Sequence, residues 1–211
     1  MPKKFSDQER DWIRLKLLAE AKRQFEFSGL RKTSVETLTK AAGIAQGSFY
    51  MFFGSKEELY YELLLQEEQR IRTRVLESHP PDQNHSRDSI RSFLMDALRL
   101  MDDSPLLRQM MERGEMELLF RKLPPELLER NELEDRDALL PVITAWRNAG
   151  IMPDTPPETI VGMIRALALL ALHKQEIGES QYSATLELLV DVLSAGMLSV
   201  SEQAKGGDVH D

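Results

Sequence analysis

The 211-residue chain fits one or two domains and can bury a sizeable core. Hydrophobic residues at 42% and charged residues at 29% are ordinary for a soluble globular protein, and the absence of cysteine excludes disulfides and thiolate chemistry. The net charge of −8 is unevenly divided: residues 1–56 hold eleven Lys or Arg against six Asp or Glu, which is +5, and this leaves −13 for the rest.

The chain opens with a predicted long helix. We expect it from Ser6 or Asp7 to Phe27, because apolar residues recur at every fourth position: Ile13, Leu17, Ala21 and Phe25. Ser28-Gly29 should end it. The start, MPKKFSDQERDW, has basic residues but no apolar core behind them, so we expect no signal peptide.

A helix-turn-helix is predicted next. Thr33 and Glu36 have the spacing of a capping box, so a short helix should begin just after Thr33. Gly43 follows where the chain must turn, because glycine enters the left-handed region without a Cβ penalty. A second short helix over residues 46–53 would turn its polar side chains outward and its phenylalanines inward. Such a unit places its second helix in the major groove of DNA.

The string TSVETLTKAAGIAQGSFYMFFGSKEEL resembles the DNA-binding signature of the tetracycline-repressor (TetR) family of bacterial regulators. The matching features are the T-S-V-E opening, the A-G-I turn, the G-S-F-Y helix and the F-x-S-K-E-E-L entry to the next helix. The resemblance covers residues 10–65 and implies a homodimer with an inducer pocket among the middle helices. The basic N-terminal segment coincides with the helix-turn-helix, which favours DNA as its partner.

Chemistry and the resemblance together indicate the DNA-facing residues. Gln46 is the candidate for base readout, since its amide can pair at two atoms of adenine. The hydroxyls or backbone of Thr33 and Ser34, the hydroxyl of Tyr50 and the charge of Lys56 are candidates for phosphate contacts, which position without reading sequence. The full candidate set is Thr33, Ser34, Gln46, Gly47, Ser48, Tyr50 and Lys56. Lys3 and Lys4 are either a minor-groove arm or simply solvated.

Helix signals continue to residue 200, and we find no strand candidate. Ser55 and Glu58 form a second capping box, and Ser104-Pro105 is a cap followed by proline at the first helical position. The further helices are expected over residues 56–78, 88–102, 105–122, 126–149 (one or two helices), 156–177 and 183–200. The prediction is an all-α protein of about nine helices. Its domains would be a helix-turn-helix domain over 1–55, a regulatory and dimerisation domain over 56–200, and a tail of disordered composition over 201–211.

The last two predicted helices carry more apolar surface than one buried face requires. Either both are core, or a second copy packs on them in a four-helix interface about a two-fold axis. In the TetR family these two helices are the usual dimer contact. The candidate interface residues are Met163, Leu167, Leu170, Leu186, Leu189 and Leu193.

The middle helices are rich in methionine and aromatic residues. At helical spacing such residues are most often core, yet an apolar cavity lined by them could accept a small lipophilic ligand. The candidate pocket residues are Phe93, Met101, Met111, Phe120, Trp146 and Arg165. His173 could add to an anion site with Arg165, but a capping role near a helix end is preferred.

The sequence favours a regulator over other classes. No metalloprotease, phosphate-loop or nucleophile-elbow motif occurs, so we expect neither an enzyme nor a cofactor or metal site. The longest apolar stretch contains Arg165 and is too short to span a bilayer, which, with the lack of cysteine, fits a cytoplasmic protein. The prediction is a homodimeric repressor that a small effector releases from a near-palindromic operator. An architectural or ligand-independent DNA-binding protein and a transcriptional activator stay open as alternatives.

Overall fold

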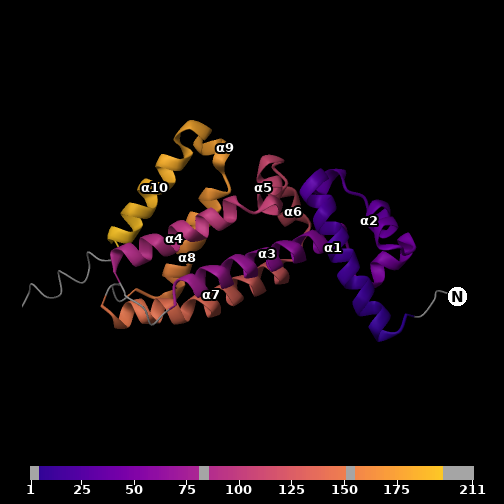
Figure 1. The fold of residues 1–211 in the computed structure, drawn as a ribbon, viewed down its shortest axis with the longest axis horizontal. Helices are drawn as coiled ribbons and strands as arrows, with labels where there is room; N and C mark the ends of the chain where they lie inside the picture. Colours follow the sequence, from indigo (N-terminus) through magenta and orange to yellow (C-terminus); the bar gives the residue numbers. More distant parts are fainter. Residues whose placement is uncertain (1–4, 81–85, 151–154, 197–211) are drawn as a thin grey trace, which may run out of the picture. The chain divides into compact units, whose positions relative to one another are not determined.

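The structure, a computed structural model, describes residues 5–80, 86–150 and 155–196, without the side chains of 128–133, 135 and 175. Every element within these ranges is helical: ten α-helices and the 3-10 helix η1 (Figure 1). The predicted all-α class is confirmed. The predicted tail over 201–211 and the pair Lys3-Lys4 lie outside the described residues.

Two compact units make up the chain, and α3 contributes residues to both. The head unit is Met1–Gln69 with Ser104–Pro124, and the body unit is Arg70–Asp103 with Pro125–Asp211. The head unit holds α1 (Asp7–Lys32), α2 (Val35–Ala42), η1 (Gln46–Met51), most of α3 (Lys56–Ser78), α5 (Pro105–Glu112) and α6 (Met116–Lys122). The body unit holds the rest of α3, α4 (Arg87–Asp102), α7 (Pro125–Asn148), α8 (Pro157–Ala171), α9 (Lys174–Ile177) and α10 (Glu179–Gly196). The domain boundary after residue 55 stays a prediction.

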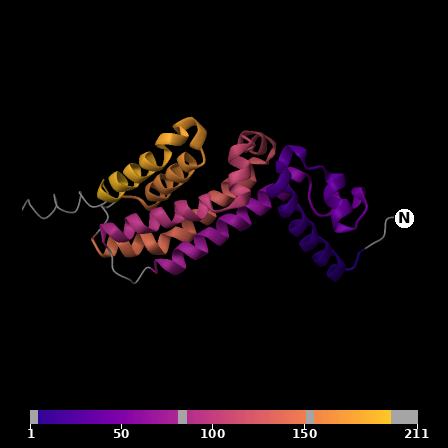
Figure 2. The ribbon, with the colours of Figure 1, turned by 45° about the horizontal axis from the view of Figure 1, so that its top comes forward.

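An aromatic and aliphatic core holds the head unit together. Leu17 and Phe25 of α1, Leu38 of α2 and Phe49 of η1 are completely buried. The ring of Phe25 meets the ring of Tyr60 on α3 edge to face, with centroids 4.7 Å apart. Because one core serves all these elements, the helix-turn-helix is fixed against α1 and α3. Both ribbon views show α1 and α2 side by side (Figures 1 and 2).

Helix α1 is interrupted at Gly29, the residue expected to end it. Gly29 has φ 74° and ψ 174°, and a last helical turn follows up to Lys32. A Cβ at residue 29 would lie 2.6 Å from Cδ of Arg113 and 2.9 Å from a carboxylate oxygen of Glu115. Glycine is therefore required twice here, by the positive φ and by the close approach of the segment between α5 and α6.

The body unit packs four long helices around a second core. Phe93 on α4 and Trp146 on α7 are buried and meet edge to face at 5.2 Å. Nε of Arg91 on α4 donates to the carboxylate of Asp191 on α10 at 2.6 Å. The hydroxyl of Tyr182 on α10 donates to the carbonyl of Ala171 at the end of α8, at 2.8 Å. Polar contacts thus fix α10 against two neighbours whose apolar faces alone would permit sliding.

Several predicted helix ends need correction. The single helix expected over 105–122 is two, α5 and α6, because Gly114 turns the chain with φ 58°. The helix expected to reach residue 177 ends at Ala171, and α9 forms separately. The stretch 126–149 is one helix despite the internal Pro141, and Ser104 caps α5 as predicted. No helix in the described ranges has both the length and the apolar character needed to cross a membrane.

Replacing Gly29 by alanine should destabilise the protein by about 2–4 kcal/mol, because the new Cβ meets Arg113 and the positive φ is strained. Urea unfolding of purified wild type and variant measures this. Gly47→Ala is the control, since a Cβ there meets nothing within 4 Å. Equal stability of the Gly29→Ala and Gly47→Ala proteins would contradict the close approach.

Candidate DNA-binding site

Helix α2 begins one residue later than the sequence predicts. Oγ of Ser34 accepts the Thr37 backbone N–H at 3.1 Å, so Ser34 is the N-cap. Thr33 is 2% exposed, and its hydroxyl donates to the carbonyl of Gly29 at 2.7 Å. The capping box expected from Thr33 and Glu36 is therefore wrong. The hydroxyl of Thr33 is thus used inside the protein, and a phosphate contact by Thr33 stays a prediction.

The turn after α2 follows the prediction closely. Gly43 adopts φ 76° and ψ 30°, and its N–H donates to the last carbonyls of α2. The next segment, η1, is a 3-10 helix of six residues and not the α-helix expected over 46–53. Its tighter winding ends where the N–H groups of Phe52 and Phe53 both donate to the carbonyl of Phe49.

Helix η1 presents polar groups outward from a buried aromatic anchor. Phe49 and Phe53 are 0% and 5% exposed, as predicted, whereas Tyr50 is 61% exposed. The Tyr50 ring stands edge to face against Phe49 at 5.5 Å, which limits its orientations. Gln46 and Gly47 are also exposed, and Ser48 is half-buried. The structure thus brings these four predicted residues, 46–48 and 50, onto one accessible segment.

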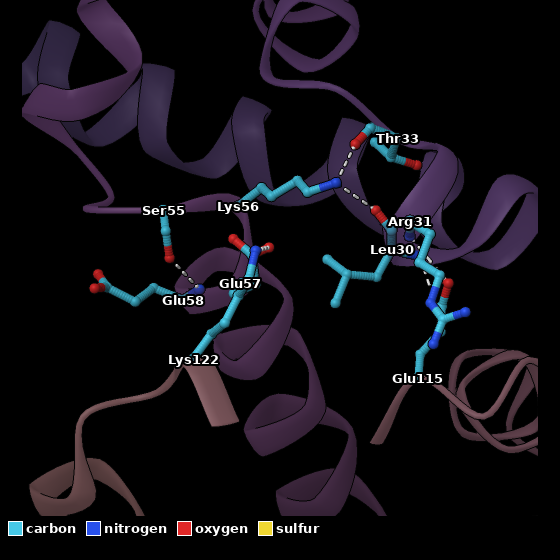
Figure 3. Close-up of polar contacts among 9 residues, drawn as sticks. All are labelled: Leu30, Arg31, Thr33, Ser55, Lys56, Glu57, Glu58, Glu115 and Lys122. Carbon is cyan, nitrogen blue, oxygen red and sulfur yellow. Dashed lines mark hydrogen bonds and ion pairs between the residues drawn. The ribbon is translucent and has the colours of Figure 1, made fainter. Parts of the chain in front are cut away.

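Lys56 has partners inside the protein. Its Nζ donates to the carbonyl of Leu30 at 2.7 Å and to that of Thr33 at 2.8 Å. Figure 3 shows the side chain of Lys56 reaching from the start of α3 to the chain between α1 and α2. Two of its three N–H donors are thereby used. A phosphate contact by Lys56 stays a prediction, but the geometry gives this lysine a structural role that the sequence did not reveal.

Two further contacts of buried carboxylates in the head unit have no signal in the local sequence. The buried carboxylate of Glu115, between α5 and α6, accepts the backbone N–H groups of Leu30 and Arg31 at 2.7 and 3.0 Å. Lys122 on α6 pairs with the buried Glu57 on α3 at 2.9 Å (Figure 3). These partners are 65–85 residues apart in sequence, so no local motif could have identified them.

The buried phenol of Tyr60 lies near this cluster. Burial raises the pKa of Tyr60 well above its usual 10.0, and the negative charge of Glu115 adds to the effect. Its hydroxyl has no hydrogen-bond partner among the described residues. Tyr60 therefore contributes to the fold as a neutral ring.

The six candidate pocket residues are divided between the units. Phe93 and Trp146 touch in the body core, and Met101 and Arg165 lie half-buried on α4 and α8 of the same unit. Met111 and Phe120 belong to the head unit, where Phe120 is 41% exposed. A pocket formed by all six stays a prediction.

The candidate interface residues are also unequal in exposure. Leu167 and Leu186 are 4% and 6% exposed and belong to the core of their own protomer. Met163, Leu189 and Leu193 are half-buried, and Leu170 is 43% exposed. Three exposed apolar residues absent from the candidate set lie on the same two helices: Leu169, Leu188 and Val192.

Residues 17–63 match the family described as "Bacterial regulatory proteins, tetR family". An uncharacterised HTH-type transcriptional regulator of Bacillus subtilis, YdgC, is 37% identical over 59 residues, which are 28% of this chain and 30% of that protein. The chain thus matches less than a third of that relative's length.

Solved structures resemble the chain over most of its length. A TetR-family transcriptional regulator from Pectobacterium atrosepticum superposes with a TM-score of 0.73 at 19% identity, over 92% of this chain and 98% of that one. SmeT, the repressor of the Stenotrophomonas maltophilia multidrug efflux pump SmeDEF, gives 0.61 at 17% identity, over 87% and 88%.

Residues 17–63 thus match the helix-turn-helix DNA-binding domain of TetR-family regulators. Over most of its length the chain has the fold of solved TetR-family transcriptional regulators.

The internal contacts of Lys56 lead to a prediction about salt dependence. Lys56→Gln should weaken DNA binding about 5- to 30-fold, because two backbone carbonyls lose a charged donor. If Lys56 also meets a phosphate, as predicted, the slope of log affinity against log salt should in addition fall by about 0.9, whereas a structural role alone would leave it unchanged. Fluorescence polarisation at several salt concentrations, with a duplex selected from a random library by the wild type, measures both. Lys174→Gln, which removes a positive charge from the body unit, is the control and should change neither quantity.

The raised pKa of Tyr60 predicts a pH effect on stability. The pKa of Tyr60 in the folded protein lies above its unfolded value of about 10. This difference stabilises the folded protein fully below about pH 10, and the stabilisation is lost as the pH rises above about 10. The free energy of unfolding of wild type should therefore fall more steeply above pH 10 than that of Tyr60→Phe. Below pH 9 the two should agree within about 1 kcal/mol, because the hydroxyl lacks a partner. Urea unfolding from pH 8 to 11 tests this, and parallel curves would contradict it.

Proposed function

We propose that the protein is a homodimeric, sequence-specific repressor of transcription that a small lipophilic ligand releases from a near-palindromic operator in the cytoplasm. The observation that carries this proposal is η1, where Gln46, Gly47 and Tyr50 are exposed on a segment anchored by the buried Phe49. Exposed polar groups on a rigid helix suit readout of base edges in the major groove.

The charge of the head supports DNA as the partner. Residues 1–56 hold +5 on a chain of −8, so the attraction for a polyanion is confined to the segment that contains the helix-turn-helix. Arg31, Lys32 and Lys40, at the ends of α1 and α2, are exposed. These cations could contact DNA phosphates beside η1, in addition to Ser34 and Tyr50.

Exposed apolar side chains on α8 and α10 support the homodimer. Leu169 and Leu170 on α8 are 47% and 43% exposed, and Leu188 and Val192 on α10 are 64% and 59% exposed. Apolar surface exposed to water does not stabilise a protomer, whereas a two-fold interface would bury this surface on both protomers. Two heads on one dimer would meet successive major grooves about 34–36 Å apart.

Effector release is proposed by analogy and from the aromatic core of the body unit. SmeT is the repressor of a multidrug efflux pump, which makes lipophilic compounds the first effector class to test. An effector that binds the body unit in one of two conformations would favour that conformation. Since α3 contributes to both units, a tilt of α3 would separate the heads and weaken operator binding.

Gln46 and Tyr50 should affect DNA binding differently. Gln46→Ala should lose about 1–3 kcal/mol of discrimination at one base position of each half-site, because a bidentate contact is removed. Tyr50→Phe should weaken all sequences evenly by about 1 kcal/mol, because it removes a phosphate contact. Binding-site selection from a random library, followed by fluorescence polarisation with selected and scrambled duplexes, separates the two effects.

The matched control is Gln66→Ala, which removes an exposed glutamine from α3, outside the helix-turn-helix. It should bind as the wild type does. An unchanged base preference in Gln46→Ala would refute the proposed role of that residue. Equal, weak binding of the wild type to every duplex would favour an architectural protein.

Leu188→Glu should convert the dimer into a monomer. The two-fold interface would bury one unpaired carboxylate from each protomer, at a cost of about 3–5 kcal/mol each. Sedimentation velocity at micromolar protein measures the mass. Leu15→Glu, on the equally exposed Leu15 of α1 (66%), should leave the dimer intact. A dimeric Leu188→Glu protein would place the interface elsewhere.

A further inference from the structure

The interruption of α1 at Gly29 creates a short joint, Leu30–Thr33, between α1 and α2. Because φ and ψ leave the helical region at Gly29, the N–H groups just after it lose their place in the helical hydrogen-bond pattern. Buried N–H groups must find other acceptors or cost free energy. Leu30 is completely buried, so the partners of the joint decide whether this conformation is stable.

Glu115 supplies the missing acceptors. Its two carboxylate oxygens receive the N–H groups of Leu30 and Arg31, at 2.7 and 3.0 Å, and the residue is 1% exposed. The carboxylate can come this close because residue 29 has no Cβ. Nearby, the guanidinium of Arg113 donates to the carbonyl of Phe27 at 3.3 Å, just before the break. A buried carboxylate is costly unless hydrogen-bonded, so this geometry is strongly favoured over one in which Glu115 withdraws.

Glu115 is itself fixed where two helices meet. Its N–H donates to the carbonyl of Met110 on α5 at 3.0 Å, and its carbonyl accepts the N–H of Leu119 on α6 at 2.9 Å. A shift of either α5 or α6 would therefore move the carboxylate. The two hydrogen bonds to the joint transmit that shift to the end of α1.

Lys56 binds the backbone carbonyls of the same joint. Its ammonium donates to the carbonyls of Leu30 and Thr33, so the N–H groups face a negative charge and the carbonyls a positive one (Figure 3). The next residue, Ser34, caps α2. The start of the helix-turn-helix is thus placed by a carboxylate from the α5–α6 segment and an ammonium from α3.

We infer that Glu115 is a positioning residue for DNA binding: through the joint Leu30–Thr33 it sets the placement of α2 and η1 according to the position of α5 and α6. The inference rests on the proposed function and adds the route by which a rearrangement of α5 and α6 alters DNA affinity. No contact between Glu115 and DNA is involved.

The test compares Glu115→Gln with Glu67→Gln. Glutamine keeps the size of the side chain but places an NH₂ group against a backbone N–H, which breaks one of the two hydrogen bonds. Glu67 is a matched control, because it is also buried in the head unit and pairs with Lys22 at 3.4 Å, away from the joint. The probe is a duplex selected from a random library by the wild type, and affinities are corrected for the active fraction by stoichiometric titration.

Glu115→Gln should bind the selected duplex at least about tenfold more weakly per active molecule, with faster amide exchange at Leu30 and Arg31. Glu67→Gln should bind within about twofold of the wild type, even if its melting temperature falls as far. Glu115→Asp keeps the charge on a shorter side chain, and its affinity for the selected duplex should lie between those of wild type and Glu115→Gln. If Glu115→Gln does not fold, Glu115→Asp takes its place in the comparison.

Two results would overturn the inference, and they are distinguishable. If exchange at Leu30 and Arg31 accelerates while the corrected affinity of the Glu115 variants equals that of the wild type, Glu115 serves stability alone. If the wild type itself selects no duplex, the proposed function fails and the inference falls with it.

Discussion

A helix that breaks at a buried glycine exposes backbone groups that need partners, and here other helices provide them. Glu115 accepts the N–H groups after the break, and Lys56 donates to the carbonyls that follow. Unpaired buried groups of this kind cost about 1–3 kcal/mol each, so the break, the glycine and the two charged residues form one interdependent unit. Ser34, which caps α2 and begins the proposed DNA-binding segment, directly follows this unit.

This arrangement explains how the head unit combines rigidity with accessibility. Phe49 and Phe53 anchor η1 in the core, while Tyr50 and Gln46 stay exposed. The segment that would read DNA therefore carries little conformational freedom that binding must remove. Because α5 and α6 belong to the head unit, the positioning that we infer for Glu115 acts within that unit.

Local signals in the sequence predicted most of the fold and the exposure of several candidate DNA-binding residues. Ser104-Pro105 and Gly43 mark helix ends through the chemistry of single residues, and both predictions hold. The exposure of Gln46 and Tyr50 followed from spacing relative to the phenylalanines. The contacts of Glu115 and Lys56 depend on groups 23 to 85 residues away, which no local pattern encodes. For the same reason Thr33, an acceptable cap by type, is buried against Gly29 while its neighbour Ser34 caps the helix.

In the proposed dimer, two copies of the head unit read one duplex at fixed spacing. Hydroxyl-radical footprinting of the wild type on its selected duplex measures this spacing. We expect two protected patches on one face of the DNA, centred about one helical turn or 34–36 Å apart, with Gln46→Ala altering cleavage only inside them. A single patch, or uniform protection along the duplex, would show that the two heads do not read one duplex in this way.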